Sequence, residues 1–123
     1  MILVDTSVWI DHFTVPDPAM QLLLDAGEVR THPFVIGELA MGSQQKPSPI
    51  KLLIKLKQVL RATDPEVLEF IRRNKLHGVG IGYMDAHLLA SARMTPEAKL
   101  WTRDKRLALA AARLSVNYEP RLN

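Results

Sequence analysis

The sequence predicts an α/β domain in which helices cover both faces of a mostly parallel sheet. Short apolar runs of strand length alternate with segments of helical periodicity along the whole chain, which is the pattern of parallel strands joined by helical crossovers. The first run, Ile2 to Val4, is apolar at every position, as in strands buried on both faces. A length of 123 residues with 47% hydrophobic residues suits one compact domain over residues 1–123.

Cap and turn residues place the elements of the first half of the chain. Asp5 ends the first strand and precedes a helix, Gly27 is a usual residue just past a helix end, and Pro33 suits the first turn of another helix. The breaker-rich segment 43–49 is typical of a loop. We therefore expect strands over residues 2–4 and 28–32, and helices over 7–13, 19–26 and 34–41.

Similar signals divide the second half. Leucines at helical spacing among lysines predict an amphipathic helix over residues 50–60. Asp64 followed by Pro65 predicts a helix start with the aspartate as N-cap, and the glycine-rich segment 78–82 is expected to be a flexible lead-in to the next helix. In all, we expect helices over 50–60, 65–76, 83–93 and 105–114, and strands over 61–63, 99–102 and 116–118.

The composition excludes several classes of protein. Without cysteine the chain has no disulfide framework, thiolate zinc site or cysteine nucleophile. Charged residues interrupt every apolar run before the roughly 20 residues that a membrane span needs, and the N-terminus has no basic signal region, so we expect a cytoplasmic protein. The chain has 16 basic and 13 acidic residues, a net charge of +3. If four of the acids form one site, the rest of the chain carries a net charge of +7, which suits a polyanionic partner.

Two aspartates follow apolar strands at positions where ligand sites form. Asp5 follows the strand at residues 2–4, and Asp104 follows the strand at 99–102. Carboxyl ends of parallel strands meet at one edge of the sheet, and ligands bind outside that edge. Each aspartate has an alternative role as the N-cap of the helix that follows it.

Two further acids lie in apolar helical segments. Glu38 lies in a segment so apolar that its helix should be largely buried, and Asp85 lies near the start of a second such helix. A buried carboxylate needs a partner to compensate its charge. For Asp85 the alternative is a helix-start acid favoured by the helix dipole.

Together, these four acids predict a metal site. Gathered without basic partners they would repel one another, and a divalent cation would relieve the repulsion. Oxygen ligands favour magnesium, with manganese as a plausible substitute, over zinc. Such a site suits phosphodiester cleavage by metal-activated water, which needs no side-chain nucleophile.

Four segments carry a resemblance to a known family: residues 3–7, 36–39, 83–90 and 101–107. In order and spacing they resemble the four acidic motifs of PIN domains. The short single-domain form is similar to the VapC-type toxins of type II toxin-antitoxin modules, and the resemblance covers essentially the whole chain. The resemblance implies that the metal-site positions of the family are occupied here by Asp5, Glu38, Asp85 and Asp104.

This resemblance implies a three-layer α/β/α fold with strand order 3-2-1-4-5. It also implies a magnesium-dependent endoribonuclease that acts on RNA, a cognate antitoxin protein as partner, and frequent homodimerisation. Thr102 matches a small polar residue that supports the site in the family, and Thr6 is a second candidate for positioning a carboxylate or water.

Other residues near the acids have two interpretations each. Arg103, Lys105 and Arg106 flank Asp104, where they either hold RNA phosphates or form a solvated helix face. His87 lies two residues after Asp85 and so on another helix face, which favours a core or interface histidine over a ligand. The leucines of residues 50–60 form either core packing or a surface for a dimer or antitoxin.

Two rival classes of function remain as alternatives. A catalytically idle PIN-like module would bind RNA or protein while its acids only cap helices. A receiver or aspartyl phosphatase also places aspartates at strand ends and binds magnesium. Its local pattern needs a second acid near Asp5, where this chain has Thr6 and Ser7.

Overall fold

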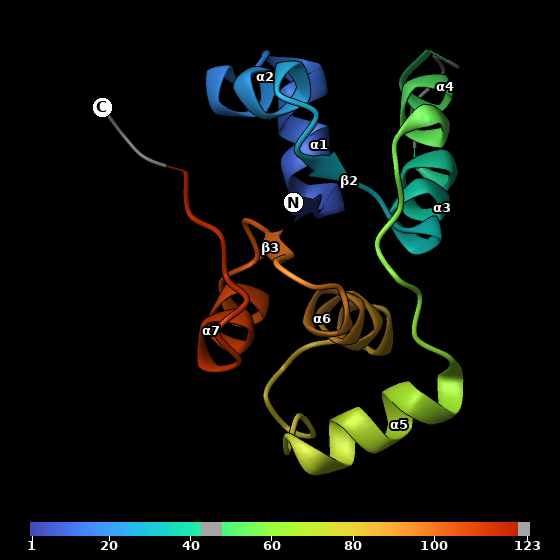
Figure 1. Ribbon diagram of the computed structural model, residues 1–123, viewed down its shortest axis with the longest axis vertical. Helices are drawn as coiled ribbons and strands as arrows, with labels where there is room; N and C mark the ends of the chain where they lie inside the picture. The colour runs from blue at the N-terminus through green and yellow to red at the C-terminus, as the bar shows by residue number, and fades with distance from the viewer. Residues whose placement is uncertain (43–47, 121–123) are drawn as a thin grey trace.

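A three-stranded parallel sheet forms the centre of the protein, with helices on both of its faces (Figure 1). The computed structural model describes residues 1–42 and 48–120. The strands are β1 (Ile2–Val4), β2 (Val29–Arg30) and β3 (Lys99–Trp101), in the order β2-β1-β3. The helices are α1 (Thr6–Thr14), α2 (Pro18–Asp25), α3 (Pro33–Met41), α4 (Ser48–Lys55), α5 (Asp64–Arg73), α6 (Tyr83–Met94) and α7 (Lys105–Arg113). The predicted α/β class is confirmed.

Two single bridges extend the sheet at its outer sides. Thr31 pairs in parallel with Gln58 beside β2, and Leu100 pairs in parallel with Asn117 beside β3. The five segments thus follow one another in the expected order 3-2-1-4-5, although the outer two form bridges rather than strands. The strand predicted over residues 116–118 is reduced to the bridge at Asn117.

The predicted third strand and the helix before it were misplaced. The helix expected over residues 50–60 ends at Lys55, and the strand expected over 61–63 is replaced by the bridge at Gln58. The helix ends early because residues 57–59 pair with the edge of the sheet: Thr31 N donates to Lys57 O at 2.9 Å, and Val59 N donates to Thr31 O at 3.1 Å. These backbone bonds hold residues 57–59 extended, which overrides the amphipathic helical pattern. Of the predicted loop 43–49, residues 43–47 lie outside the described residues.

Helix α5 begins with a different cap from the one predicted. Thr63, not Asp64, is the N-cap: its hydroxyl accepts from Glu66 N at 3.3 Å, and Glu66 Oε1 accepts from Thr63 N at 2.9 Å. This reciprocal capping box satisfies two backbone donors and places Asp64 inside the helix. The helix ends at Arg73, three residues before the predicted end at Leu76. The change frees the Asp64 carboxylate for other contacts.

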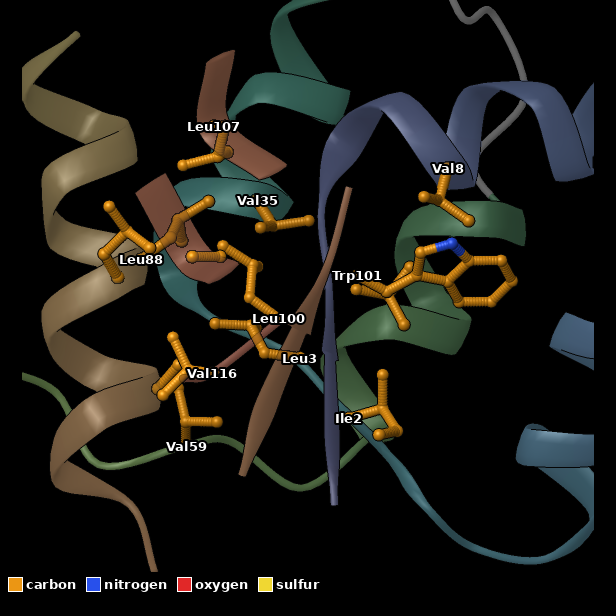
Figure 2. Close-up of a cluster of buried hydrophobic side chains, with 14 of the residues drawn as sticks. Ile2, Leu3, Val8, Val35, Val59, Leu88, Leu100, Trp101, Leu107 and Val116 are labelled. Carbon is orange, nitrogen blue, oxygen red and sulfur yellow. The ribbon is translucent and has the colours of Figure 1, made fainter. Parts of the chain in front are cut away.

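The core fixes β1 and β3 side by side. Figure 2 shows Leu3 and Leu100 pointing to the α6 face of the sheet, while Trp101 points to the opposite face toward Val8. All four side chains are at most 3% exposed, and each contributes roughly 1.5–3 kcal/mol by burial. Trp9 is also fully buried, so both tryptophans belong to the core as expected. Because the two strands are parallel and in register, the acids that follow them reach the same edge.

Candidate active site

Asp5 leaves β1 directly at this edge, and its carboxylate is 7% exposed. It stands at the N-cap position of α1, yet the side chain caps no backbone group. Instead, Oδ2 accepts from Thr102 Oγ1 at 2.7 Å and from Ser7 Oγ at 2.8 Å. The alternative of a plain helix cap therefore fails for Asp5. Two hydroxyl groups thus orient a buried carboxylate through Oδ2, while Oδ1 has no hydrogen-bond partner within the described residues.

Thr102 and Ser7 join the two strand ends. Thr102 is 8% exposed, and its hydroxyl accepts from Asp104 N at 3.1 Å while donating to Asp5. Ser7 Oγ accepts from Arg103 N at 3.0 Å. The predicted supporting position of Thr102 is thus in contact with both aspartate motifs. Ser7 was missed as a supporting residue, although its place two residues after Asp5 was the available signal.

Asp104 combines both of its expected roles. It is the N-cap of α7, and Oδ1 accepts from Leu107 N at 3.0 Å. The capping alternative is therefore correct for one oxygen of Asp104. The side chain as a whole stays exposed, so the cap leaves the carboxylate accessible at the sheet edge.

Glu38 and Asp85 approach from the two neighbouring helices. Thr6 Oγ1 donates to Glu38 Oε1 at 3.3 Å, which links α1 to α3. The expectation that Glu38 is buried was wrong, because Val35 and Leu39 take the inward face of α3 and leave Glu38 exposed. Asp85 is half-buried in the first turn of α6, where Gly82 N donates to its Oδ2 at 3.5 Å.

The four carboxylates interact electrostatically. Partial desolvation and then the charge of Asp5 raise the pKa of Glu38, with a smaller contribution from Asp85. Desolvation and then Asp5 also raise the pKa of Asp85, and Asp104 adds to the effect. Within the described residues none of the four forms an ion pair with a basic side chain. Repulsion among them is therefore uncompensated by protein cations.

The oxygen ligands that these four carboxylates offer match the chemical preference of a hard divalent cation. The carboxylates do not, however, form a preformed ligand shell. Residues 1–42 and 48–120 contain no group of three or more carboxylate or imidazole side chains arranged to hold a metal ion. Magnesium, however, is commonly held by one or two carboxylates while it keeps several waters. Mutually repelling, oxygen-only donors beside an exposed edge meet that requirement.

The predicted basic cluster divides into two parts. Arg103 donates to Asp11 Oδ2 and to Asp17 Oδ2, each at 2.5 Å, and its guanidinium lies 5.9 Å from the Trp101 ring centroid. These contacts raise the pKa of Arg103 and commit its charge to the fold. Lys105 and Arg106 are exposed and form no ion pair within the described residues.

A second polar cluster lies between α5 and α6, outside the four acids. His87 is 1% exposed, as expected for a core histidine, and its Nε2 lies 2.9 Å from Asp64 Oδ1. Tyr83 Oη donates to the same oxygen at 2.8 Å. The Phe34 ring packs against His87 with centroids 4.7 Å apart. Sequence reasoning did not find this cluster, because Asp64 was interpreted as a cap.

Comparison with known proteins identifies the class of this protein. A family model described as PIN domain matches residues 2–113, so the chain belongs to the PIN-domain family, as its acidic motifs predicted. Among individual proteins, it is similar to Ribonuclease VapC32 of Mycobacterium tuberculosis, from strains CDC 1551 / Oshkosh and ATCC 25618 / H37Rv. Each is 47% identical over 117 residues, which cover 94% of this chain and 94% of the relative.

Proposed function

We propose that this protein is a magnesium-dependent endoribonuclease and the toxin component of a toxin-antitoxin module. The observation that carries the proposal is the geometry of Asp5: a buried carboxylate is oriented by two hydroxyls among other acids. Desolvation, and then the charge of Asp5, raises the pKa of Glu38 and of Asp85. Structural carboxylates are normally paired with donors that neutralise their charge. The similarity to a protein named Ribonuclease VapC32 supports RNA as the substrate.

In this proposal the carboxylates of Asp5, Glu38, Asp85 and Asp104 hold the cation, with manganese as a substitute for magnesium. When bound, the cation supplies an activated water and electrostatic stabilisation of the cleaved phosphodiester. The chain's own groups keep the ligands oriented. Thr102 and Ser7 fix Asp5 through Oδ2, and Thr6 restrains Glu38.

The proposed partners are RNA, a cognate antitoxin and a second copy of the chain. Apolar side chains are exposed on α4 and on the segment after it: Leu52 is 41% exposed, Ile54 62% and Leu60 54%. Leu53 alone among the predicted leucines is fully buried, so the stripe is divided between core and surface. The exposed part supports a protein partner. Among the described residues, no helix is both long enough and apolar enough to cross a bilayer.

The decisive experiment incubates the purified protein with single-stranded RNA in magnesium and, separately, in EDTA. Asp5→Asn and the matched exposed variant Asp25→Asn are purified in parallel, so that a contaminating nuclease appears equally in all samples. We expect cutting only in magnesium and only with Asp5 intact. RNA binding without cutting would favour the idle module, and labelling of the protein by acetyl phosphate would favour a phosphotransfer domain.

A further inference from the structure

A hollow of about 390 Å³ opens at the start of α5, and none of the four acids lines it. His87, which lines the hollow, lies on α6 with Asp85, and Phe34, which packs against His87, lies on α3 with Glu38. Phe34 precedes Glu38 by four residues, so the two share one face of α3 at a spacing of about 5–6 Å. The hollow is lined by Arg61, Ala62, Thr63, Asp64, Pro65 and His87.

Asp64 presents an ionised carboxylate with one oxygen free. Tyr83 and His87 both bond to Oδ1, and Oδ2 has no hydrogen-bond partner within residues 1–42 and 48–120. The hydrogen bond from Tyr83, followed by that from His87, lowers the pKa of Asp64, so the group is negative at neutral pH. A carboxylate held at one oxygen offers the other as an acceptor for N–H donors.

Arg61 supplies donors on the same hollow. Its guanidinium lies 5.3 Å from the Phe34 ring centroid, which is a cation–π contact. It forms no ion pair among the described residues, so its N–H groups are available. His87 completes the wall, and its buried Nδ1 also lacks a partner in the described part of the chain. The hollow thus combines one acceptor, a fork of donors and the imidazole of His87.

We propose that this hollow is a nucleobase subsite that binds guanine in the RNA beside the scissile phosphate. Guanine presents the N1–H and N2–H donors to an ionised carboxylate, and its O6 and N7 accept from arginine. Adenine has an acceptor at N1, which the carboxylate would repel. Bases in single-stranded RNA are commonly read by such edge contacts near aromatic side chains.

A bare phosphate fits this hollow less well than a base. Asp64 and Glu66 place two negative charges in the first turn of α5, and the capping box already uses the backbone donors there. An anion would meet repulsion where a base with N–H donors meets an acceptor. The subsite rests on the proposed function in one respect, namely that RNA is the substrate.

The test measures binding in EDTA, so that it is independent of cleavage. Fluorescence anisotropy compares heptauridylates whose central base is guanine, hypoxanthine, adenine or cytosine. We expect guanine to bind about tenfold more tightly than adenine. Hypoxanthine, which lacks the 2-amino group, should fall between them.

Variants localise the preference. Asp64→Ala should remove it, and Arg61→Ala should reduce it, whereas Arg72→Ala is the matched control because Arg72 is exposed and paired with Glu69 on another part of α5. Tyr83→Phe should keep the preference, since it leaves Oδ2 of Asp64 free. Thermal melting identifies a variant that has lost its fold, and Arg61→Ala then carries the test alone.

The outcomes separate the subsite from the nuclease. Equal binding of the four oligonucleotides, a preference for cytosine, or no measurable binding would overturn the subsite even if the protein cuts RNA. A guanine preference that depends on Asp64 and Arg61 supports it even if magnesium produces no cleavage. In that case only the proposed nuclease activity would fail.

Discussion

Two aspartates of this protein each accept two side-chain hydrogen bonds at a single oxygen, but their surroundings differ. Asp5 Oδ2 takes the hydroxyls of Ser7 and Thr102 at the buried edge of the sheet. Asp64 Oδ1 accepts from the Tyr83 hydroxyl and lies within hydrogen-bond distance of His87 Nε2. The Asp64 side chain is 73% exposed. The same local geometry therefore occurs in a buried acidic site and on the open surface between α5 and α6.

The neighbouring charges decide what each carboxylate is suited to do. Asp5 lies among acids: desolvation, and then the charge of Asp5, raises the pKa of Glu38 and of Asp85, so full ionisation of that site costs free energy and favours a cation. The hydrogen bond from Tyr83, then that from His87, lowers the pKa of Asp64, and the charge of Arg61 adds a smaller contribution, so the negative charge of Asp64 is already stabilised by the protein. Such a charge is suited to bind a neutral hydrogen-bond donor.

The largest expected effect comes from Asp5→Asn. Because the amide removes a ligand charge, RNA cleavage in magnesium should fall by more than about 100-fold. The free energy of unfolding in EDTA should be unchanged or slightly higher, since repulsion with Glu38 and Asp85 is relieved. Initial cleavage rates and thermal melting test both statements. Wild-type cleavage by Asp5→Asn, with Asp25→Asn as the control, would refute the assignment of Asp5.

Removing the hydroxyl that orients Asp5 should have the next largest effect. Thr102→Val deletes the 2.7 Å bond to Asp5 and the acceptor for Asp104 N, and we expect cleavage to fall about 10–100-fold. Thr102→Ser keeps the hydroxyl and should restore most of the activity. The concentration of magnesium at half-maximal rate should also rise for Thr102→Val. If Ser and Val behave alike, Thr102 acts only through packing.

Much of this site could be predicted because it follows from strand ends. A short apolar run followed by an acid gives the edge position of Asp5 and Asp104, and parallel topology gives their proximity. The exposure of Glu38 could not be predicted, since apolar residues surround it in sequence but only Val35 and Leu39 of α3 are fully buried. Periodicity over one short helix leaves such a rotation open.

The second aspartate was missed for a different physical reason. Asp-Pro is a strong helix-start pattern, and it hid the fact that Thr63 and Glu66 form a complete capping box. The contacts of Asp64 come from α6, about 20 residues further along the chain, and depend on packing between helices. Likewise, residues 57–59 were assigned to a helix because their pairing with Thr31 is a tertiary interaction. Local sequence patterns carry no information on either contact.

Replacing an aspartate by asparagine should change the melting temperature in opposite directions at Asp85 and at Asp64. In EDTA, Asp85→Asn should melt at the same or a higher temperature than the wild type, because it relieves repulsion with Asp5 and Asp104. Asp64→Asn should melt at a lower temperature, because it weakens two hydrogen bonds to an ionised acceptor. Thermal melting at neutral pH measures both. A lower melting temperature for both variants would show that the two regions do not differ in this way.

The pH dependence of these differences should follow the two pKa shifts. The raised pKa of Asp85 contributes stability at low pH that is lost as pH rises through the folded value, so the advantage of Asp85→Asn grows toward neutral pH. The lowered pKa of Asp64 contributes stability that is present above the ordinary value of 3.8 and is lost below it. The deficit of Asp64→Asn should therefore shrink as pH falls below about 3.8. Melting series from pH 3 to 7 test both statements. An Asp85→Asn advantage that did not grow toward neutral pH, or an Asp64→Asn deficit that did not shrink at low pH, would contradict them.

The smallest expected effect concerns Lys105 and Arg106, the basic residues beside Asp104 that no acid of the described chain neutralises. If they bind RNA phosphates, replacing both with alanine should weaken RNA binding and reduce the slope of log affinity against log salt by about 1.4, for two contacts to a single strand. Arg103 is left unchanged, because it is bound to Asp11 and Asp17 and its loss would disturb the fold. Cleavage at saturating RNA should persist, since phosphate contacts remote from the reacting bond stabilise the ground and transition states equally. Titrations at several salt concentrations in EDTA measure the slope, with Arg72→Ala as a control for the loss of an exposed positive charge. An unchanged slope would show that Lys105 and Arg106 form a solvated helix face, and the four acids and the Asp64 hollow would then be the two remaining proposed sites of RNA contact.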